Sequence, residues 1–376
     1  MRPERPFGLI AVVASAGVIL VACGGGAAPV ASSAAAKPSS AAPAASAAAS
    51  TKPAASVSAR PTGSAAASAA PASGAAGANT IKLISFSRSL GFLAANAKGF
   101  LEKEKLNVVY EQTPSSAVQM RGLLDGKWDL AHTAPDNVMA FVDKEKADAV
   151  AVFVGELGLN QKLIVKPDIT SYGQLRGQTL AVDAIDTGFA FALRKMLQKN
   201  GLNEADYKFE AVGGTTQRYA ALKDGKVVGG LLSEPFESMA VRDGFRLLQA
   251  ASDYFPTYPG STSVAVTRKW ATSHRDQLVG YQRALLAGLD WGADPAHREE
   301  AIDIIAADQK VPRDQAMRLY ENERKSVSLN HPNESQIMAT LQTVLDLRRE
   351  FAPNTGSQAS PTAYYDGGFA RAAEGK

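Results

Sequence analysis

Apolar and polar positions follow two periods from residue 80 onward. Short apolar runs with the spacing of strands alternate with stretches in which apolar residues recur every three or four positions, as on a helix face. We expect strands over 81–86, 108–110, 129–133, 148–154 and 161–166, and then over 179–183, 207–212, 227–232, 245–248 and 261–267. Strands that alternate with helices predict mostly parallel sheets covered by helices on both faces.

Helices are expected between these strands and through most of the chain after residue 275. The clearest ones lie over 90–104, 189–199, 275–291, 297–308, 313–324 and 334–351. In the last of these, Ile337, Leu341 and Val344 recur at helical spacing and predict a buried face. The tail after Pro353 is expected to pack only in part.

One unit of this pattern occurs twice. A helix, an Asp-Gly-Lys turn, a strand and a proline follow one another at Asp125, and again at Asp224, 99 positions later (224 − 125). The repeat predicts two similar α/β lobes with a binding cleft between them, although Asp-Gly-Lys is also a common turn between a helix and a strand. We expect one lobe to comprise residues 79–166 and 262–376 and the other to comprise residues 167–261.

Residues 1–22 have the pattern of an export signal. Arg2 and Arg5 precede an apolar run that is too short to span a bilayer comfortably. The run ends in Leu-Val-Ala-Cys at Cys23, which resembles a bacterial lipoprotein signal that is cut before a lipidated cysteine. Since Cys23 is the chain's one cysteine, we interpret it as a lipidation site that anchors the protein to the membrane. The alternative is an ordinary signal peptide with an incidental cysteine.

Residues 24–78 consist mainly of Ala, Ser, Pro and Gly. Such a segment has too little apolar surface to offset the conformational entropy of folding, so residues 23–78 are expected to form a disordered tether. A flexible chain of this length has an r.m.s. reach of about 40 Å. The tether would therefore keep a folded domain near the membrane but clear of its surface.

Charge is nearly balanced in the rest of the chain. Residues 1–78 hold five of the 40 basic residues and one of the 37 acidic ones, which leaves 35 basic (40 − 5) and 36 acidic (37 − 1) residues for 79–376. Nucleic-acid binding needs an excess of basic residues on one face. The composition therefore predicts no nucleic-acid partner.

Three stretches resemble one family, the periplasmic binding proteins for nitrate, sulfonates, taurine and thiamine-pyrimidine precursors. Residues 97–108 are similar to its A-K-G-x-F-x-K-x-G-L-x-V stretch, with Lys105 at the usual glycine. Residues 175–182 resemble the L-K-G-K-x-V-A-V that opens the second lobe. Residues 222–236 resemble a segment that ends in E-P-F, with Val228 or Gly229 at its usual aspartate. The resemblance spans about residues 80–350.

The resemblance implies an α/β fold class, the type II periplasmic-binding-protein fold, with two α/β lobes and a cleft between them. It implies a small-molecule solute as ligand and an ABC permease and ATPase as partners. The solute would be a sulfonate, carboxylate, amine or pyrimidine captured by closure of the lobes. A monomer without cofactor is expected, on the outer side of the cell membrane.

Ligands of open α/β sheets bind at the carboxyl ends of the strands. This rule selects as ligand-binding candidates Ser87, Arg88, Thr133, Asp136 and Asn137 in the first lobe, and Asp186, Thr187, Gly188, Phe189, Thr215, Ser233 and Glu234 in the second. The helix that starts at Thr187 offers N–H groups for an anion, although Asp186 or Thr187 equally fits an N-cap. Unless it points away, Asp186 argues against a strongly anionic ligand there, and it would equally suit an amine or a pyrimidine amino group.

Other side chains leave two interpretations open. Arg88 is a candidate partner for a carboxylate or sulfonate, or else a solvated loop charge. Glu234 is either an acceptor for the ligand or an N-cap. The aromatic loop 254–259 either stacks on a planar ligand or packs over the lobe edge. His132 and Trp128 are expected to have core or edge roles.

Enzymatic motifs are missing from the sequence. It contains no H-E-x-x-H, G-x-S-x-G, P-loop or C-x-x-C pattern, and its four histidines are scattered. We therefore expect no catalytic residues, no metal site and no cofactor. The alternatives are a ligand-sensing surface receptor and, less favoured, an enzyme of pyrimidine-precursor metabolism.

Overall fold

The computed structural model describes residues 79–155, 157–326, 332–355 and 359–376. The expected export signal, the lipidation site Cys23 and the tether lie outside these residues. Within the described chain, no helix combines the length and the apolar character needed to cross a membrane.

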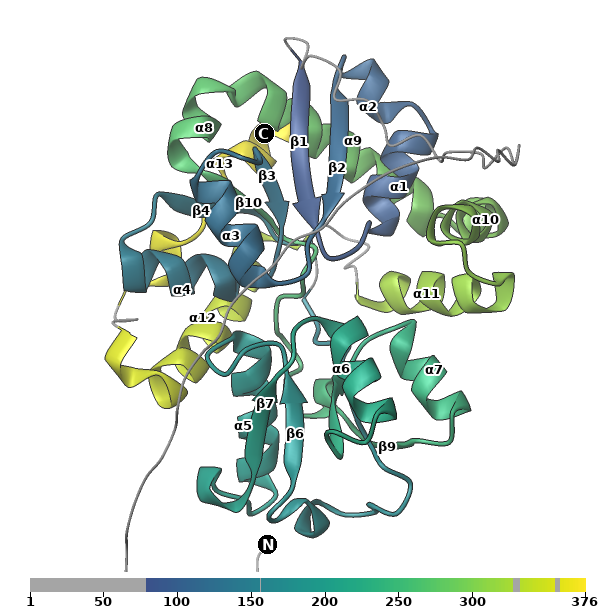
Figure 1. Cartoon of the computed structure of the whole chain (residues 1–376). Helices are drawn as coiled ribbons and strands as arrows, with labels where there is room; N and C mark the ends of the chain where they lie inside the picture. Colours follow the sequence, from purple (N-terminus) through teal and green to yellow (C-terminus); the bar gives the residue numbers. More distant parts are fainter. Residues whose placement is uncertain (1–78, 156, 327–331, 356–358) are drawn as a thin grey trace, which may run out of the picture. The chain divides into compact units, whose positions relative to one another are not determined.

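Two five-stranded sheets organise the chain (Figure 1). The first has the order β2 (Asn107–Gln112), β1 (Thr80–Ser85), β3 (Leu130–His132), β10 (Val264–Thr267) and β4 (Ala149–Phe153). The second has the order β7 (Lys208–Ala211), β6 (Thr179–Val182), β8 (Gly229–Leu232), β5 (Lys162–Val165) and β9 (Arg246–Ala250). In each sheet the first three strands are parallel and the fourth is antiparallel to both neighbours. The two expected α/β lobes are confirmed.

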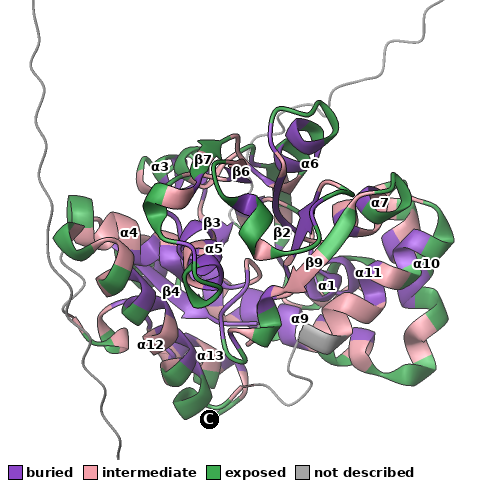
Figure 2. Cartoon of the chain, turned by 90° about the horizontal axis from the view of Figure 1, so that it is seen from below, coloured by how far each residue is buried: buried purple, intermediate pink, exposed green. Residues whose placement is uncertain are grey.

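Helices cover both faces of each sheet. The first sheet has α1 (Leu90–Ala97), α2 (Phe100–Lys103), α9 (Arg275–Ala293) and α13 (Gly368–Ala373) on one face and α3 (Ser116–Leu124) and α4 (Pro135–Glu145) on the other. The second sheet has α5 (Gly188–Lys199) on one face and α6 (Thr215–Lys223) and α7 (Phe236–Arg242) on the other. Buried residues gather in β3, β4 and α5, whereas the edge strand β9 is partly exposed (Figure 2).

Four more helices complete the described chain: α8 (Arg268–Ser273), α10 (Arg298–Gln309), α11 (Arg313–Ser326) and α12 (Glu334–Phe351). Helices α10 and α11 pack against each other beside α1, through a core that includes Ile302, Ile305 and Tyr320. Helix α12 packs against both α4 and α5. It therefore joins the first lobe to the second.

Three expectations need correction. The helix expected over 90–104 is divided into α1 and α2, because Gly99 adopts a positive φ of 69°. The strand β5 was assigned to the first lobe but pairs with β8 and β9 in the second sheet. Its apolar side chains alternate between the α5 face and the α6–α7 face, which suits a strand inside that sheet. The tail after Pro353 is better packed than expected, since Tyr364 and Phe369 are buried.

The repeated Asp-Gly-Lys turns have the same local structure. Asp125 and Asp224 are the C-cap residues of α3 and α6. Gly126 and Gly225 follow with φ values of 72° and 71°, a conformation that favours glycine. Because both turns precede their strands, they lie at the amino ends of β3 and β8, and their role is structural.

His132 and Trp128 belong to the interior of the first lobe, as expected. His132 is buried, and its Nε2 lies 2.7 Å from the Tyr281 hydroxyl. The Trp128 ring packs against Gly122 of α3, where a Cβ atom would come within 1.9 Å of it. Burial lowers the pKa of His132 from 6.5 to about 4.

Stability should therefore fall as the pH drops from 6.5 toward 4. In that window the unfolded chain protonates His132 and the folded protein does not, so protons favour the unfolded state. At pH 5 this histidine should lower the free energy of unfolding by about 2 kcal/mol relative to pH 7. Urea unfolding at both pH values, compared with the same pair for His132→Gln, measures the difference. An equal pH dependence in the two proteins would contradict the prediction.

Candidate functional site

A cavity of about 770 Å³ lies between the two lobes. Its walls come from the segments that follow β1, β3, β6, β7 and β8, which are the carboxyl ends of parallel strands in both sheets. Small-molecule sites commonly have volumes of about 300–1,000 Å³. The cavity therefore has the position and the size of a small-ligand site.

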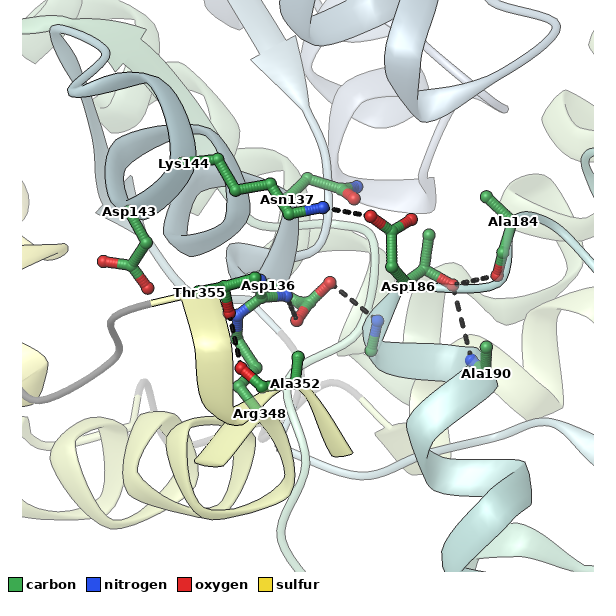
Figure 3. A network of polar contacts seen from close by, with 12 residues as sticks. Asp136, Asn137, Asp143, Lys144, Ala184, Asp186, Ala190, Arg348, Ala352 and Thr355 are labelled. Carbon is green, nitrogen blue, oxygen red and sulfur yellow. Dashed lines mark hydrogen bonds and ion pairs between the residues drawn. The ribbon is translucent and has the colours of Figure 1, made fainter. Parts of the chain in front are cut away.

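Most of the candidate residues line this cavity: Ser87, Arg88, Asp136, Asn137, Thr187, Gly188, Phe189, Thr215, Ser233 and Glu234. Thr133 and Asp186 do not. Thr133 is buried, and its hydroxyl accepts a hydrogen bond of 2.8 Å from Asn137 Nδ2 within its own lobe. Asp186 pairs instead with Lys144 of α4 (Figure 3). A residue that directly follows a strand lies near the cleft, but its side chain need not face the cavity.

The start of α5 is occupied by a carboxylate of the protein itself. Asp136 Oδ2 accepts a 2.7 Å hydrogen bond from the Gly188 backbone N–H, and Asp136 Oδ1 accepts one of 2.7 Å from Arg348 Nη1. Asp136 thus lies between α12 and the first turn of α5 (Figure 3). Burial alone would lower the pKa of Arg348, but the charge of Asp136 raises it. This ion pair ties the two lobes and α12 together.

Thr187 is the N-cap of α5. Its hydroxyl accepts a hydrogen bond from the Ala190 backbone N–H and donates one of 2.7 Å to Asp183 Oδ1. The N-cap interpretation is therefore confirmed for Thr187. Together with Asp136, it leaves the N–H groups of Gly188 and Ala190 engaged within the protein.

Arg88 also has a partner inside the protein. Its Nε lies 3.1 Å from Asp308 Oδ2 of α10, and its guanidinium lies 4.8 Å from the centre of the Tyr110 ring. Burial raises the pKa of Asp308, although the charge of Arg88 opposes the shift. Arg88 is therefore not a solvated loop charge, and its positive charge is already paired with Asp308.

A second arginine on the wall was missed by the sequence analysis. Arg218 of α6 is buried and donates to the carbonyls of Leu231 and Gly213 and to the Thr215 hydroxyl. It stabilises the charged form of Asp183, whose pKa is nevertheless raised by burial. One signal was present: Arg218 is one helical turn before the core residue Leu222, on the apolar side of its helix.

Four buried polar atoms of wall residues make no hydrogen bond to any described residue. They are Glu234 Oε2, Gln161 Oε1, the Tyr258 hydroxyl and Asp308 Oδ2, the last of which is engaged in the ion pair with Arg88. The other oxygen of Glu234 accepts a 2.5 Å hydrogen bond from the Ser238 hydroxyl. Glu234 is not the N-cap of α7, since that position is Pro235. In the aromatic loop, Tyr258 reaches the cavity, while Phe255 packs in the core.

No metal site is indicated by the part of the chain that the structure describes. It holds no group of three or more His, Cys, Asp or Glu side chains arranged around a common point. The cavity instead combines arginines, carboxylates, hydroxyls and aromatic rings. Such a lining suits binding of a polar organic molecule.

Two α/β lobes with this strand order, connected by two crossing segments and separated by a cleft, define the two-lobed periplasmic binding-protein fold. The model of the NMT1-like family matches residues 81–306. The chain belongs to this family.

Solved structures show the same fold at low sequence identity. The alkanesulfonate-binding protein SsuA from Xanthomonas axonopodis pv. citri, bound to MOPS, is 18% identical, with 78% of this chain and 99% of that chain covered and a TM-score of 0.65. The periplasmic nitrate-binding protein NrtA from Synechocystis PCC 6803 is 15% identical, with 79% and 88% covered and a TM-score of 0.65.

An enzyme has the same fold. The desulfurization enzyme DSZB is 12% identical, with 79% of this chain and 99% of that chain covered and a TM-score of 0.59. No curated protein matches the chain in sequence. The fold therefore accommodates both binding and catalysis, and the distinction between them rests on the residues of the cavity.

Proposed function

We propose that this protein captures a small organic solute between its lobes and delivers it to an ABC permease and ATPase. The observation that carries the proposal is the cavity of about 770 Å³ whose wall is shared by both lobes. A solute held by both lobes favours the closed arrangement, and a permease can recognise that arrangement. The sulfonate and nitrate binding proteins with this fold support the same role.

The proposal includes a cellular location for the protein. The short apolar leader and Cys23 favour export followed by lipidation, which would hold a monomer at the outer face of the cell membrane. Fatty-acid labelling of the wild type and of Cys23→Ala tests the anchor. Label in both proteins, or in neither, would contradict it.

Catalysis is disfavoured by the residue inventory of the chain. DSZB has been solved as a cysteine-to-serine mutant with biphenyl-2-sulfinic acid. The one cysteine of this chain, Cys23, precedes the fold. None of the described wall residues is a cysteine, which supports a binding function rather than catalysis by a thiol.

A solute that binds only the folded protein should raise its melting temperature. We expect such a shift from at least one compound in a library of sulfonates, carboxylates, amines and pyrimidines. Glu234→Ala should lose most of it, because Glu234 lines the cavity, whereas Asp186→Ala should keep it, because Asp186 lies outside. Differential scanning fluorimetry measures both. A library without any active compound would overturn the solute-binding proposal, and equal losses in the two variants would place the site elsewhere.

A further inference from the structure

The charged side chains on the cavity wall are mostly acidic. Two arginines, Arg88 and Arg218, face four carboxylates: Asp136, Asp183, Glu234 and Asp308. The formal sum of these groups is −2 (2 − 4), and it is −1 when Arg348, which pairs with Asp136 from behind the wall, is included. A cleft lined by one sign of charge concentrates ligands of the opposite sign.

The positive groups at the wall are already engaged. Arg88 is paired with Asp308, and three nitrogens of Arg218 each donate to an oxygen of the protein. The first-turn N–H of α5 at Gly188 donates to Asp136. An anion that entered the cavity would have to displace one of these internal acceptors or bind at the first turn of α6, which has no side-chain cap.

Acceptors without donors are present in the same cavity. Glu234 Oε2 and Gln161 Oε1 accept no hydrogen bond from the described residues. The two residues lie near each other, because Gln161 directly precedes β5, whose first residue, Lys162, pairs with Leu232 two positions before Glu234. Gln161 is only 8% exposed, so its unpaired oxygen is unfavourable until a donor reaches it.

We propose that the solute is an organic cation, such as an amine, amidine or guanidine, whose N–H groups are bound by Glu234 and Gln161. Asp136 contributes because its carboxylate already accepts a hydrogen bond at the N-terminus of α5, which would otherwise attract an anion. This inference rests on the proposed solute-binding function and gives it a ligand class. It separates this chain from the alkanesulfonate- and nitrate-binding proteins that have the same fold.

Matched pairs of probes test the sign of the ligand charge. Isothermal titration of the full chain would compare benzylamine with benzoate and butylamine with butanesulfonate, supported by thermal-shift libraries of organic cations and organic anions. We expect cations to bind at least about tenfold more tightly than anions of the same skeleton, and less tightly as salt is added. Tighter binding by anions overturns the inference but leaves the solute-binding function in place. If no compound of either library shifts the melting temperature, both this inference and the proposed solute-binding function are overturned.

Glu234→Gln tests the residue that carries the charge. The change keeps the shape of the side chain and should weaken binding of the best cation about tenfold. Asp224→Asn is the matched control, because it removes the same charge from an exposed turn at the opposite end of β8. Gln161→Met, which removes an acceptor without a charge, should weaken binding severalfold. Wild-type affinity in both Glu234→Gln and Gln161→Met would overturn the assignment, and melting temperatures show that each variant is folded.

Discussion

Replacing Arg348 by methionine should lower the free energy of unfolding by about 3–5 kcal/mol, because it leaves the Asp136 carboxylate buried without its partner. Both side chains are almost fully shielded from solvent, with exposed fractions of 0% and 2%. The guanidinium also lies 5.6 Å from the centre of the Phe191 ring of α5, a contact that the variant loses. Urea unfolding followed by circular dichroism measures the effect.

An exposed ion pair provides the control for Arg348→Met. Arg371 pairs with Glu334, and these side chains are 50% and 61% exposed, so Arg371→Met should cost only about 0–1 kcal/mol. The double variant Asp136→Asn/Arg348→Met should be more stable than Arg348→Met alone, because no buried charge is then unpaired. A single variant as stable as Arg371→Met would show that the buried pair has no structural role.

Regular structure was largely predictable from local patterns. The strands β4 and β6 are short apolar runs, and β3 and β8 each follow a helix and an Asp-Gly-Lys turn, so period and turn chemistry locate them. The membership of β5 was not predictable in this way. Its apolar run fits either sheet, and only its pairing with β8 and β9 assigns it to the second.

The sequence predicted where the cavity lies but not which contacts its residues make. The rule that ligands bind at the carboxyl ends of strands located Arg88, Thr187 and Glu234 on its wall. It did not indicate that Arg88 pairs with Asp308, 220 positions later (308 − 88), or that Asp136 pairs with Arg348, 212 positions later. Such pairs depend on long-range packing of helices that no local pattern encodes.

Electrostatic character follows from those missed contacts. From the sequence, Arg88 and the start of α5 were candidates for binding an anion, with a solvated loop charge and an N-cap as the alternatives. In the structure, Asp308 and Asp136 neutralise both features. The sequence left both anions and amines open as ligands, and these two contacts are the structural basis for the cation proposed above.

Gly188→Ala should weaken solute binding by about 1–3 kcal/mol, which corresponds to roughly tenfold to a hundredfold in Kd. A Cβ atom at this position would lie 2.3 Å from the Tyr258 hydroxyl and 2.7 Å from Asp136 Cγ. Tyr258 and Asp136 both line the cavity, and Asp136 reaches α5 from the other lobe. The added methyl group must therefore push the first-lobe wall away from α5.

Isothermal titration with the best ligand from the library measures this loss, and circular dichroism shows whether the fold persists. Gly173→Ala is the control, because the nearest atom to a Cβ there is the Ser171 hydroxyl at 4.0 Å. Gly173 precedes β6 and lies outside the cavity, so Gly173→Ala should bind the ligand with the affinity of the wild type. If Gly188→Ala also keeps that affinity, the contact between Asp136 and α5 does not shape the binding site, and the carboxylate serves stability alone.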